Sequence, residues 1–207
     1  MRMDLRGRID ATLLRHDVLI SAVVEFAERA AREGMRSVVV YPFYAQRLAA
    51  TDMGIPICTV VGFPHGSQLK EAKVGEAKLA REIGVSEIDY VISISAVKNG
   101  LFDYLKEEAD LITAVFSGTV KAIIEVPLLS ENELKSTLRA LESTDVDYVK
   151  TSTGLYRPVT SDDVRRIKEL TDKKIKASGG IRTKEQAIEL VRSGADVLGT
   201  SKPVNIL

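Results

Sequence analysis

Two lysines stand near the ends of two short apolar runs, and a glycine turn follows each of them. Lys150 lies in Tyr148-Val-Lys-Thr-Ser-Thr-Gly154, and Lys176 lies in Ile175-Lys-Ala-Ser-Gly-Gly180. A free lysine amine is protonated near neutral pH, but burial or a neighbouring cation lowers its pKa. If both amines enter one pocket, each disfavours the charge on the other, and the neutral amine can form a Schiff base. The pair therefore indicates amine nucleophilic catalysis, although a single strand lysine more often extends its ammonium into water.

A carboxylate accompanies the lysines in a third apolar run. Asp89 lies in Glu87-Ile-Asp-Tyr-Val-Ile92, where strand alternation places it on one face with Glu87. A buried carboxylate needs a partner. The partner is either a structural lysine or one of the two lysines above, and the two possibilities are compatible. Glu125 shares a predicted strand face with Lys121 and could join a charged network in the same interior.

Glycine turns follow the last three predicted strands. They contain Gly154, the pair Gly179 and Gly180, and Gly199, with Ser201 close behind. Backbone N–H groups exposed by such turns can bind a phosphate, although plain turns are the commoner use of glycine pairs. His16 and His65 do not pair into a metal-binding motif.

The elements that must position these residues alternate between short β-branched runs and longer amphipathic stretches. Helical spacing is clear over 18–33, 69–83 and 185–192, and capping boxes pair Ser130 with Glu133 and Thr183 with Gln186. Eight βα units predict a closed (β/α)8 TIM barrel, in the α/β class, as a single domain over 1–207. Because six residues follow Ser201, the eighth helix is expected to be truncated or missing. A doubly wound open sheet is the alternative. The predicted strands are the segments around Ile9, 38–40, 57–61, 88–94, 121–126, 148–150, 175–177 and 197–198.

The composition is that of an ordinary globular chain. Its 207 residues are 45% hydrophobic and 28% charged, with 29 Lys and Arg against 29 Asp and Glu. The balance gives no basic excess for a nucleic acid or an anionic membrane. Residues 1–8 do not resemble a signal peptide, and Cys58 is the single cysteine. We therefore expect a cytoplasmic protein without nucleic-acid or membrane partners.

In these segments the sequence resembles the class I deoxyribose-phosphate aldolases, which are Schiff-base enzymes on a (β/α)8 barrel. The resemblance covers most of the chain. Its most specific part is the pair of lysine-bearing segments. The matching segments are Ile9-Asp-Ala-Thr-Leu-Leu14, Val61-Gly-Phe-Pro-His-Gly66, Glu87-Ile-Asp89, Ile123-Ile-Glu125, Tyr148-Val-Lys-Thr-Ser-Thr-Gly154, Lys176-Ala-Ser-Gly-Gly-Ile-Arg-Thr183 and Leu198-Gly-Thr-Ser201.

The resemblance implies a role for each candidate residue. Lys150 would form the Schiff base, Lys176 would lower its pKa, and Asp89 would work in the proton relay. The substrate would be 2-deoxy-D-ribose 5-phosphate, cleaved reversibly to acetaldehyde and D-glyceraldehyde 3-phosphate in deoxyribonucleotide catabolism. No metal and no organic cofactor is implied, and a homo-oligomer, dimer or tetramer, is expected. The residues implied at the substrate and its phosphate are Gly154, Gly179, Gly180, Gly199, Ser201, Asp10 and Thr12.

The sequence departs from the family pattern near the expected phosphate site. Residues 155–160 replace a glycine-rich loop, and Lys202 stands where a second serine is usual. Two other functions therefore stay open. One is a class I aldolase of the same fold with a different aldehyde substrate. The other is a barrel that binds a sugar phosphate without turning it over. A purely structural interpretation would make the strand lysines core ion pairs.

Overall fold

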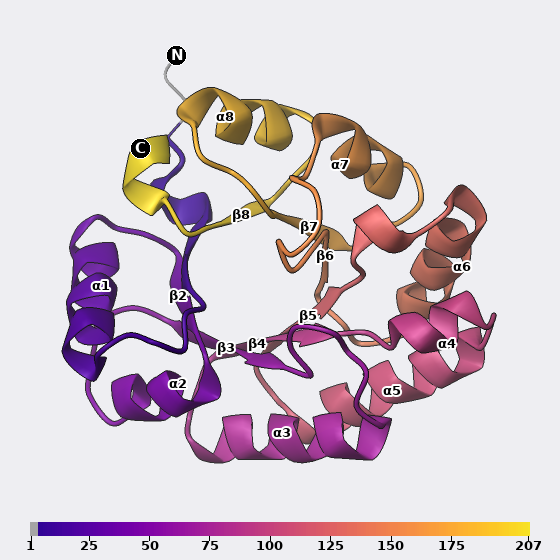
Figure 1. The fold of residues 1–207 in the computed structure, drawn as a ribbon, viewed down its shortest axis with the longest axis horizontal. Helices are drawn as coiled ribbons and strands as arrows, with labels where there is room; N and C mark the ends of the chain where they lie inside the picture. The colour runs from indigo at the N-terminus through magenta and orange to yellow at the C-terminus, as the bar shows by residue number, and fades with distance from the viewer. Residues whose placement is uncertain (1–3) are drawn as a thin grey trace.

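The computed structural model describes residues 4–207, and its strands form one closed parallel barrel in the order β1 to β8 (Figure 1). Each strand pairs with its neighbours in the chain, and β8 closes on β1. The predicted eight-stranded barrel is confirmed, and the open-sheet alternative is wrong. The strands are β1 (Ile9–Leu13), β2 (Ser37–Val40), β3 (Ile57–Val61), β4 (Glu87–Val91), β5 (Thr119–Ile123), β6 (Tyr148–Lys150), β7 (Lys174–Ser178) and β8 (Val197–Thr200).

Helices cover the outside of the barrel (Figure 1). After β8 the described chain continues as a single 3-10 turn, η3 (Pro203–Ile206), which packs between β1 and α8 in place of an α-helix. A helix after β8 is therefore missing from the described residues, as the sequence predicts. The helices are α1 (Ile20–Arg32), α2 (Pro42–Ala49), α3 (Lys70–Glu82), α4 (Ile94–Lys98), α5 (Phe102–Val115), α6 (Glu131–Glu142), α7 (Ser161–Lys168) and α8 (Lys184–Arg192), with the 3-10 turns η1 (Arg6–Arg8) and η2 (Val126–Leu128).

Two strands end earlier than the sequence predicts. The segment assigned to a strand over 88–94 leaves the sheet after Val91, because the Ser93 hydroxyl caps α4 by accepting from the backbone N–H of Ala96. The segment over 121–126 leaves it after Ile123, and Glu125 adopts φ 51°. L-residues seldom adopt this left-handed conformation. Both predicted capping boxes, at the starts of α6 and α8, are confirmed.

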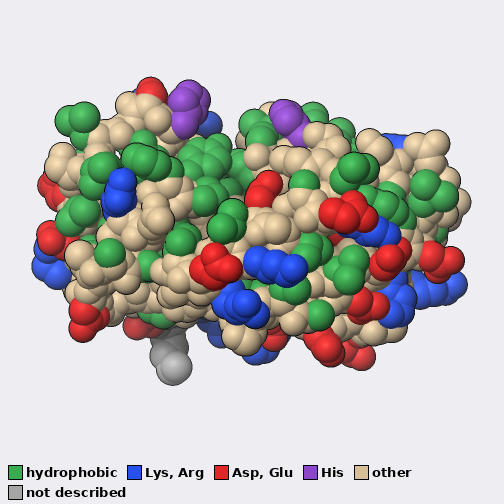
Figure 2. Space-filling view, turned by 90° about the horizontal axis from the view of Figure 1, so that it is seen from below, with side chains coloured by type: hydrophobic (Ala, Val, Ile, Leu, Met, Phe, Trp, Pro, Cys, Tyr) green, Lys and Arg blue, Asp and Glu red, His purple; other side chains and the backbone are tan. Residues whose placement is uncertain are grey.

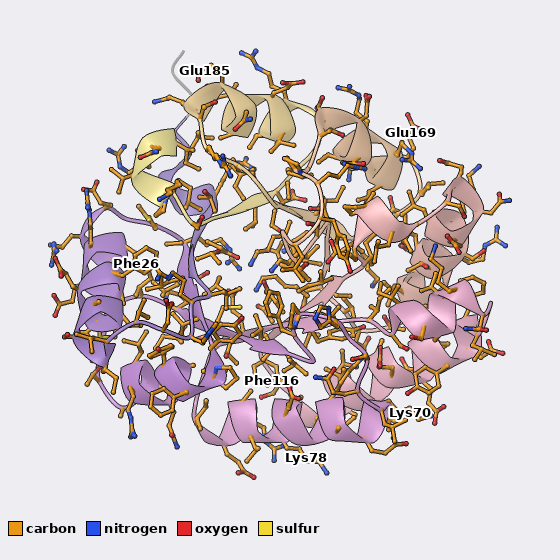
Figure 3. All side chains as sticks on the ribbon, in the orientation of Figure 1. Phe26, Lys70, Lys78, Phe116, Glu169 and Glu185 are labelled. Carbon is orange, nitrogen blue, oxygen red and sulfur yellow. The ribbon has the colours of Figure 1, made fainter. Side chains whose placement is uncertain are left out.

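The two faces of the strands differ in chemistry. Outward-facing side chains such as Val38, Ile88 and Val149 are fully buried under the helices and form the main hydrophobic core. Inward-facing side chains crowd the centre of the barrel (Figure 3), where several are charged. No helix in residues 4–207 is long and apolar enough to cross a membrane. The expectation about a leader concerned residues 1–8, of which 1–3 lie outside the described residues.

Candidate active site

The three predicted catalytic residues meet inside the barrel. Parallel pairing sets Lys150 on β6 directly beside Lys176 on β7. Their amines each lie 2.7 Å from Oδ2 of Asp89, which reaches across from β4. All three side chains are nearly or fully buried. One carboxylate oxygen thus accepts hydrogen bonds from both amines at the carboxyl end of the barrel.

The two amines differ in their tendency to hold a proton. Burial, together with the positive charge of Lys176, lowers the pKa of Lys150, although Asp89 opposes this shift. The pKa of Lys176 is raised, because the carboxylates of Asp10 and Asp89 outweigh its burial. Three lysines hold the pKa of Asp89 well below its ordinary value despite its burial. Lys150 is therefore the amine that gives up its proton first, and Lys176 stays charged beside it.

A second layer of ionic groups lies below this trio. Lys176 contacts Oδ2 of Asp10 at 2.6 Å, and the attraction of nearby cations lowers the Asp10 pKa from 3.8 to about 2 against its burial. Lys121 on β5 contacts Asp89 at 3.1 Å and Glu87 at 2.5 Å. Asp89 therefore pairs both with a structural lysine and with the two lysines of the mouth, as the sequence analysis allows.

Sequence reasoning missed Arg36 at the base of this network. Arg36 precedes β2 and donates to both Glu87 oxygens, at 2.6 and 3.0 Å, and to Asp10. Its only sequence signal is a positive charge directly before a continuous run of buried strand residues. The pairing depends on the register of β1, β2 and β4 around the closed barrel.

The structure contradicts the suggestion that Glu125 joins the ionic interior. The backbone turns at this residue, and its carboxylate accepts from the N–H of Thr153, at 3.1 and 3.3 Å, and from the Thr153 hydroxyl. Glu125 thereby ties the loop after β5 to the loop after β6. Strand alternation misplaced it because the strand had already ended.

The predicted phosphate-binding glycines form a compact group at the mouth. Gly154 and Gly179 both have positive φ, and a Cβ added to Gly179 would lie 2.8 Å from Oγ of Ser152. Gly180 packs beneath Pro158. Gly199 has ordinary φ, but a Cβ there would lie 3.1 Å from Cε of Lys176. The glycines thus combine left-handed turns with close approaches to the mouth.

The other predicted substrate residues lie at different depths. Thr12 is half-buried on β1, and its hydroxyl donates to the carbonyl of Asp10. Ser201 is exposed and, with Lys202 and Arg29, lines a pocket of about 240 Å³ between α1 and η3. Within residues 4–207, no cluster of His, Cys, Asp and Glu is arranged to hold a metal ion.

A small apolar cluster adjoins the charged interior, where Sγ of Cys58 lies 3.3 Å from Oδ1 of Asp89. Val39 on β2 and Cys58 and Val60 on β3 form a small buried cluster, against which Tyr41 and Phe63 pack. Burial and the nearby Asp89 raise the pKa of Cys58 far above its ordinary value. Hydrophobic side chains also gather around a notch at the upper edge of the molecule in Figure 2. Apolar side chains thus border the charged groups of the interior.

A closed eight-stranded barrel, with a buried lysine of lowered pKa among charged groups at the strand ends, is the arrangement of a barrel aldolase, a carbon–carbon lyase. No family model matches the chain. A deoxyribose-phosphate aldolase of Dictyoglomus turgidum is 37% identical over 213 residues, covering 100% of this chain and 97% of its own length. A relative of the same name from Aquifex aeolicus is 34% identical, covering 99% and 95%. The chain belongs to the deoxyribose-phosphate aldolase family.

Solved structures agree with this assignment. An aldolase called QR15 superposes with a TM-score of 0.95 at 34% identity, covering 99% of this chain and 95% of its own. The tetrameric deoxyribose phosphate aldolase of Aeropyrum pernix superposes with a TM-score of 0.89 at 32% identity, covering 98% and 88%. The full barrel is therefore shared with these proteins.

Proposed function

We propose that this protein is a deoxyribose-phosphate aldolase that cleaves 2-deoxy-D-ribose 5-phosphate reversibly to acetaldehyde and D-glyceraldehyde 3-phosphate. The observation that carries the proposal is the buried Lys150 amine, whose pKa is lowered and which shares one oxygen of Asp89 with the charged Lys176. A neutral amine beside a fixed cation and a fixed carboxylate is the arrangement that amine nucleophilic catalysis requires.

The proposed reaction begins when the Lys150 nitrogen attacks C1 of the open-chain sugar. Loss of water gives an iminium, whose positive nitrogen draws electrons from the bond that breaks. Because acetaldehyde carries two carbons, that bond joins C2 and C3. The C3 hydroxyl loses its proton as glyceraldehyde 3-phosphate leaves, and an enamine remains on Lys150. Protonation of C2 and hydrolysis then release acetaldehyde and restore the amine.

Asp89 and Lys176 would manage the protons of these steps. Asp89 is held charged by its lysine neighbours, so it is placed to stabilise the iminium on Lys150. We propose that Asp89 takes the C3 hydroxyl proton through a water molecule held by the charged Lys176, and that the same water returns the proton to C2. Lys176 keeps its own charge because Asp10 and Asp89 both contact it.

The glycine group at the mouth would hold the phosphate. The proposed donors are backbone N–H groups of Gly154, Gly179, Gly180 and Gly199, with Ser201 at the edge. The loop after β6 is braced for this role, since the N–H of Val159 donates to the carbonyl of Gly179. Two parallel contacts from Arg157 to Asp163, at 2.6 and 2.7 Å, fix the same loop to α7. The loop therefore differs from a glycine-rich one in sequence but is well anchored.

The test is a comparison of 2-deoxyribose 5-phosphate with unphosphorylated 2-deoxyribose, measured by trapping the released aldehydes enzymatically. We expect a much higher kcat/KM for the phosphate ester, and loss of turnover in Lys150→Ala. The exposed Lys78→Ala is the matched surface control. Equal turnover of both sugars would favour an aldolase with a different aldehyde substrate, and no turnover by the folded protein would favour a sugar-phosphate-binding barrel.

We further propose that residues 1–207 act as one aldolase domain in the cytoplasm, in deoxyribonucleotide catabolism, without nucleic-acid or membrane partners. The single buried Cys58 and the balanced charge support this setting. A homo-oligomer is proposed because the Aeropyrum pernix relative is a tetramer. Sedimentation of the purified protein would test the assembly.

A further inference from the structure

The ionic network of the barrel runs from the mouth to the opposite end, at the N-terminal ends of the strands. Arg36 is its last member there. Two routes connect Arg36 to the nucleophile. One passes through Asp10, Lys176 and Asp89, and each member contacts the next. The second route leaves Arg36 through Glu87 and Lys121 and reaches the other oxygen of Asp89. Lys150 joins both routes at Asp89.

The charges of this network do not balance when every group is ionised. Its side chains are four cations and three carboxylates, so one positive charge is in excess within a largely buried network. The excess is removed if one amine loses its proton, and Lys150 is the one of the four whose pKa is lowered. The pKa values of the other three cations are raised. The members are Arg36, Lys121, Lys150 and Lys176 against Asp10, Glu87 and Asp89.

We propose that Arg36, at the far end of the barrel from the reacting atoms, is a positioning residue that keeps the Lys150 amine neutral by supplying the network's excess positive charge. The inference rests on the proposed function of Lys150. Without Arg36, three cations would face three carboxylates, and the network would be neutral with Lys150 protonated. Removing a carboxylate would have the opposite effect.

A neighbouring arginine makes it possible to distinguish the effect of Arg36 on the network from the effect of any positive charge at this end of the barrel. Its side chain is 18% exposed, toward a hollow of about 500 Å³ at the N-terminal ends of the strands. Arg8 lines the same hollow but donates to the backbone carbonyl of Asp196 and makes no contact with Asp10 or Glu87 in the described residues. The charged and titratable groups that contact Arg36 are Asp10, Glu87 and the ring of Tyr148. The other charged groups that line the hollow are Asp4, Arg8, Lys174 and Asp196. The titratable groups around Lys150 are Asp89, Lys176 and Cys58.

The experiment measures how pH controls imine formation at Lys150. Purified variants are incubated with acetaldehyde and cyanoborohydride across a pH series, and the initial rate of ethyl-lysine formation is read by peptide mass mapping. The variants are Arg36→Met, Arg36→Lys and Glu87→Gln, with Arg8→Met as the matched control that removes a cation from the same hollow.

We expect the midpoint of the pH profile to rise by about one unit in Arg36→Met, as for charges on the order of 10 Å apart at an effective dielectric constant near 20. Arg36→Lys and Arg8→Met should keep the wild-type midpoint. Glu87→Gln should move the midpoint to lower pH. If Arg36→Met does not fold, this variant alone tests whether the network's charge sets the midpoint of Lys150.

A purely structural role for Arg36 would lower the rate by one factor at every pH. Midpoints that stay at the wild-type value in the folded Arg36→Met and Glu87→Gln proteins would overturn the inference. If the wild-type protein itself gives no adduct at Lys150 at any pH, the proposed function fails as well. An adduct in the wild type with unmoved midpoints in the variants refutes only the role of Arg36.

Discussion

Replacing Lys176 with methionine should shift the pH at which Lys150 becomes an active amine. Both amines lie 2.7 Å from the same Asp89 oxygen, so their separation cannot exceed twice that distance. Two unit charges on the order of 5 Å apart interact by about 3 kcal/mol at an effective dielectric constant near 20, which corresponds to about two pKa units. Losing the Lys176 charge should therefore raise the pKa of Lys150 by about that amount.

The direction of this pKa shift determines what a pH profile of activity should show. A raised pKa leaves less neutral amine near pH 7, so kcat/KM there should fall by about 100-fold, and its acid limb should move about two units toward alkaline pH. Lys176→Arg retains the charge and should keep the limb near its wild-type position. The acid limb of kcat/KM reports the free enzyme, so the profile is measured at low substrate concentration. If kcat/KM falls equally at every pH and the limb does not move, the electrostatic account of Lys176 is wrong.

Three further predictions concern stability and packing. Lys73→Met leaves the fully buried Glu108 without the partner that contacts it at 2.7 Å, and should destabilise the fold by about 3–5 kcal/mol in urea unfolding. Lys78→Met, on the outer side of the same helix (Figure 3), should have little effect, and equal losses would contradict this. The Asp10 pKa is about 2 in the fold against an ordinary 3.8, so its contribution of about 2 kcal/mol is complete above pH 4 and is lost as pH falls toward 2. Asp10→Asn should flatten that acid slope, and an unchanged slope would refute the assignment. Gly199→Ala places a methyl group 3.1 Å from Cε of the second lysine and should lower kcat while leaving the midpoint of unfolding nearly unchanged; wild-type kcat would show that the neighbours yield freely.

The barrel could be predicted because its signals are local. Alternating strand and helix patterns mark each βα unit, and the boxes at Ser130 and Thr183 fix two helix starts. A third box, at Thr160, was missed because its N3 residue is Asp163 and not the usual Glu or Gln. The strand ends near Ser93 and Glu125 were misplaced, because a serine cap and a left-handed residue interrupt runs that stay apolar in sequence.

The meeting of Lys150, Lys176 and Asp89 could be predicted in outline, whereas the ionic network around them could not. Residues near the carboxyl ends of the strands gather at the mouth of any parallel barrel, so the proximity of the lysines can be expected before their exact register is known. Contact of Arg36 with Glu87 joins residues 51 positions apart and depends on how far each strand is staggered around the barrel. Register of that kind is set by packing over the whole closed sheet. The pairing of Lys121 with Glu87 has the same origin.

The proposed reaction depends on a covalent imine between Lys150 and the carbonyl substrate. The most direct measurement is incubation with acetaldehyde and sodium borohydride, followed by intact mass and peptide mapping, beside a Lys150→Ala control. We expect an ethyl group on Lys150 that is absent from the control. A folded protein that carries no adduct at Lys150, or carries it equally at other lysines in both proteins, would show that Lys150 is not the imine-forming residue.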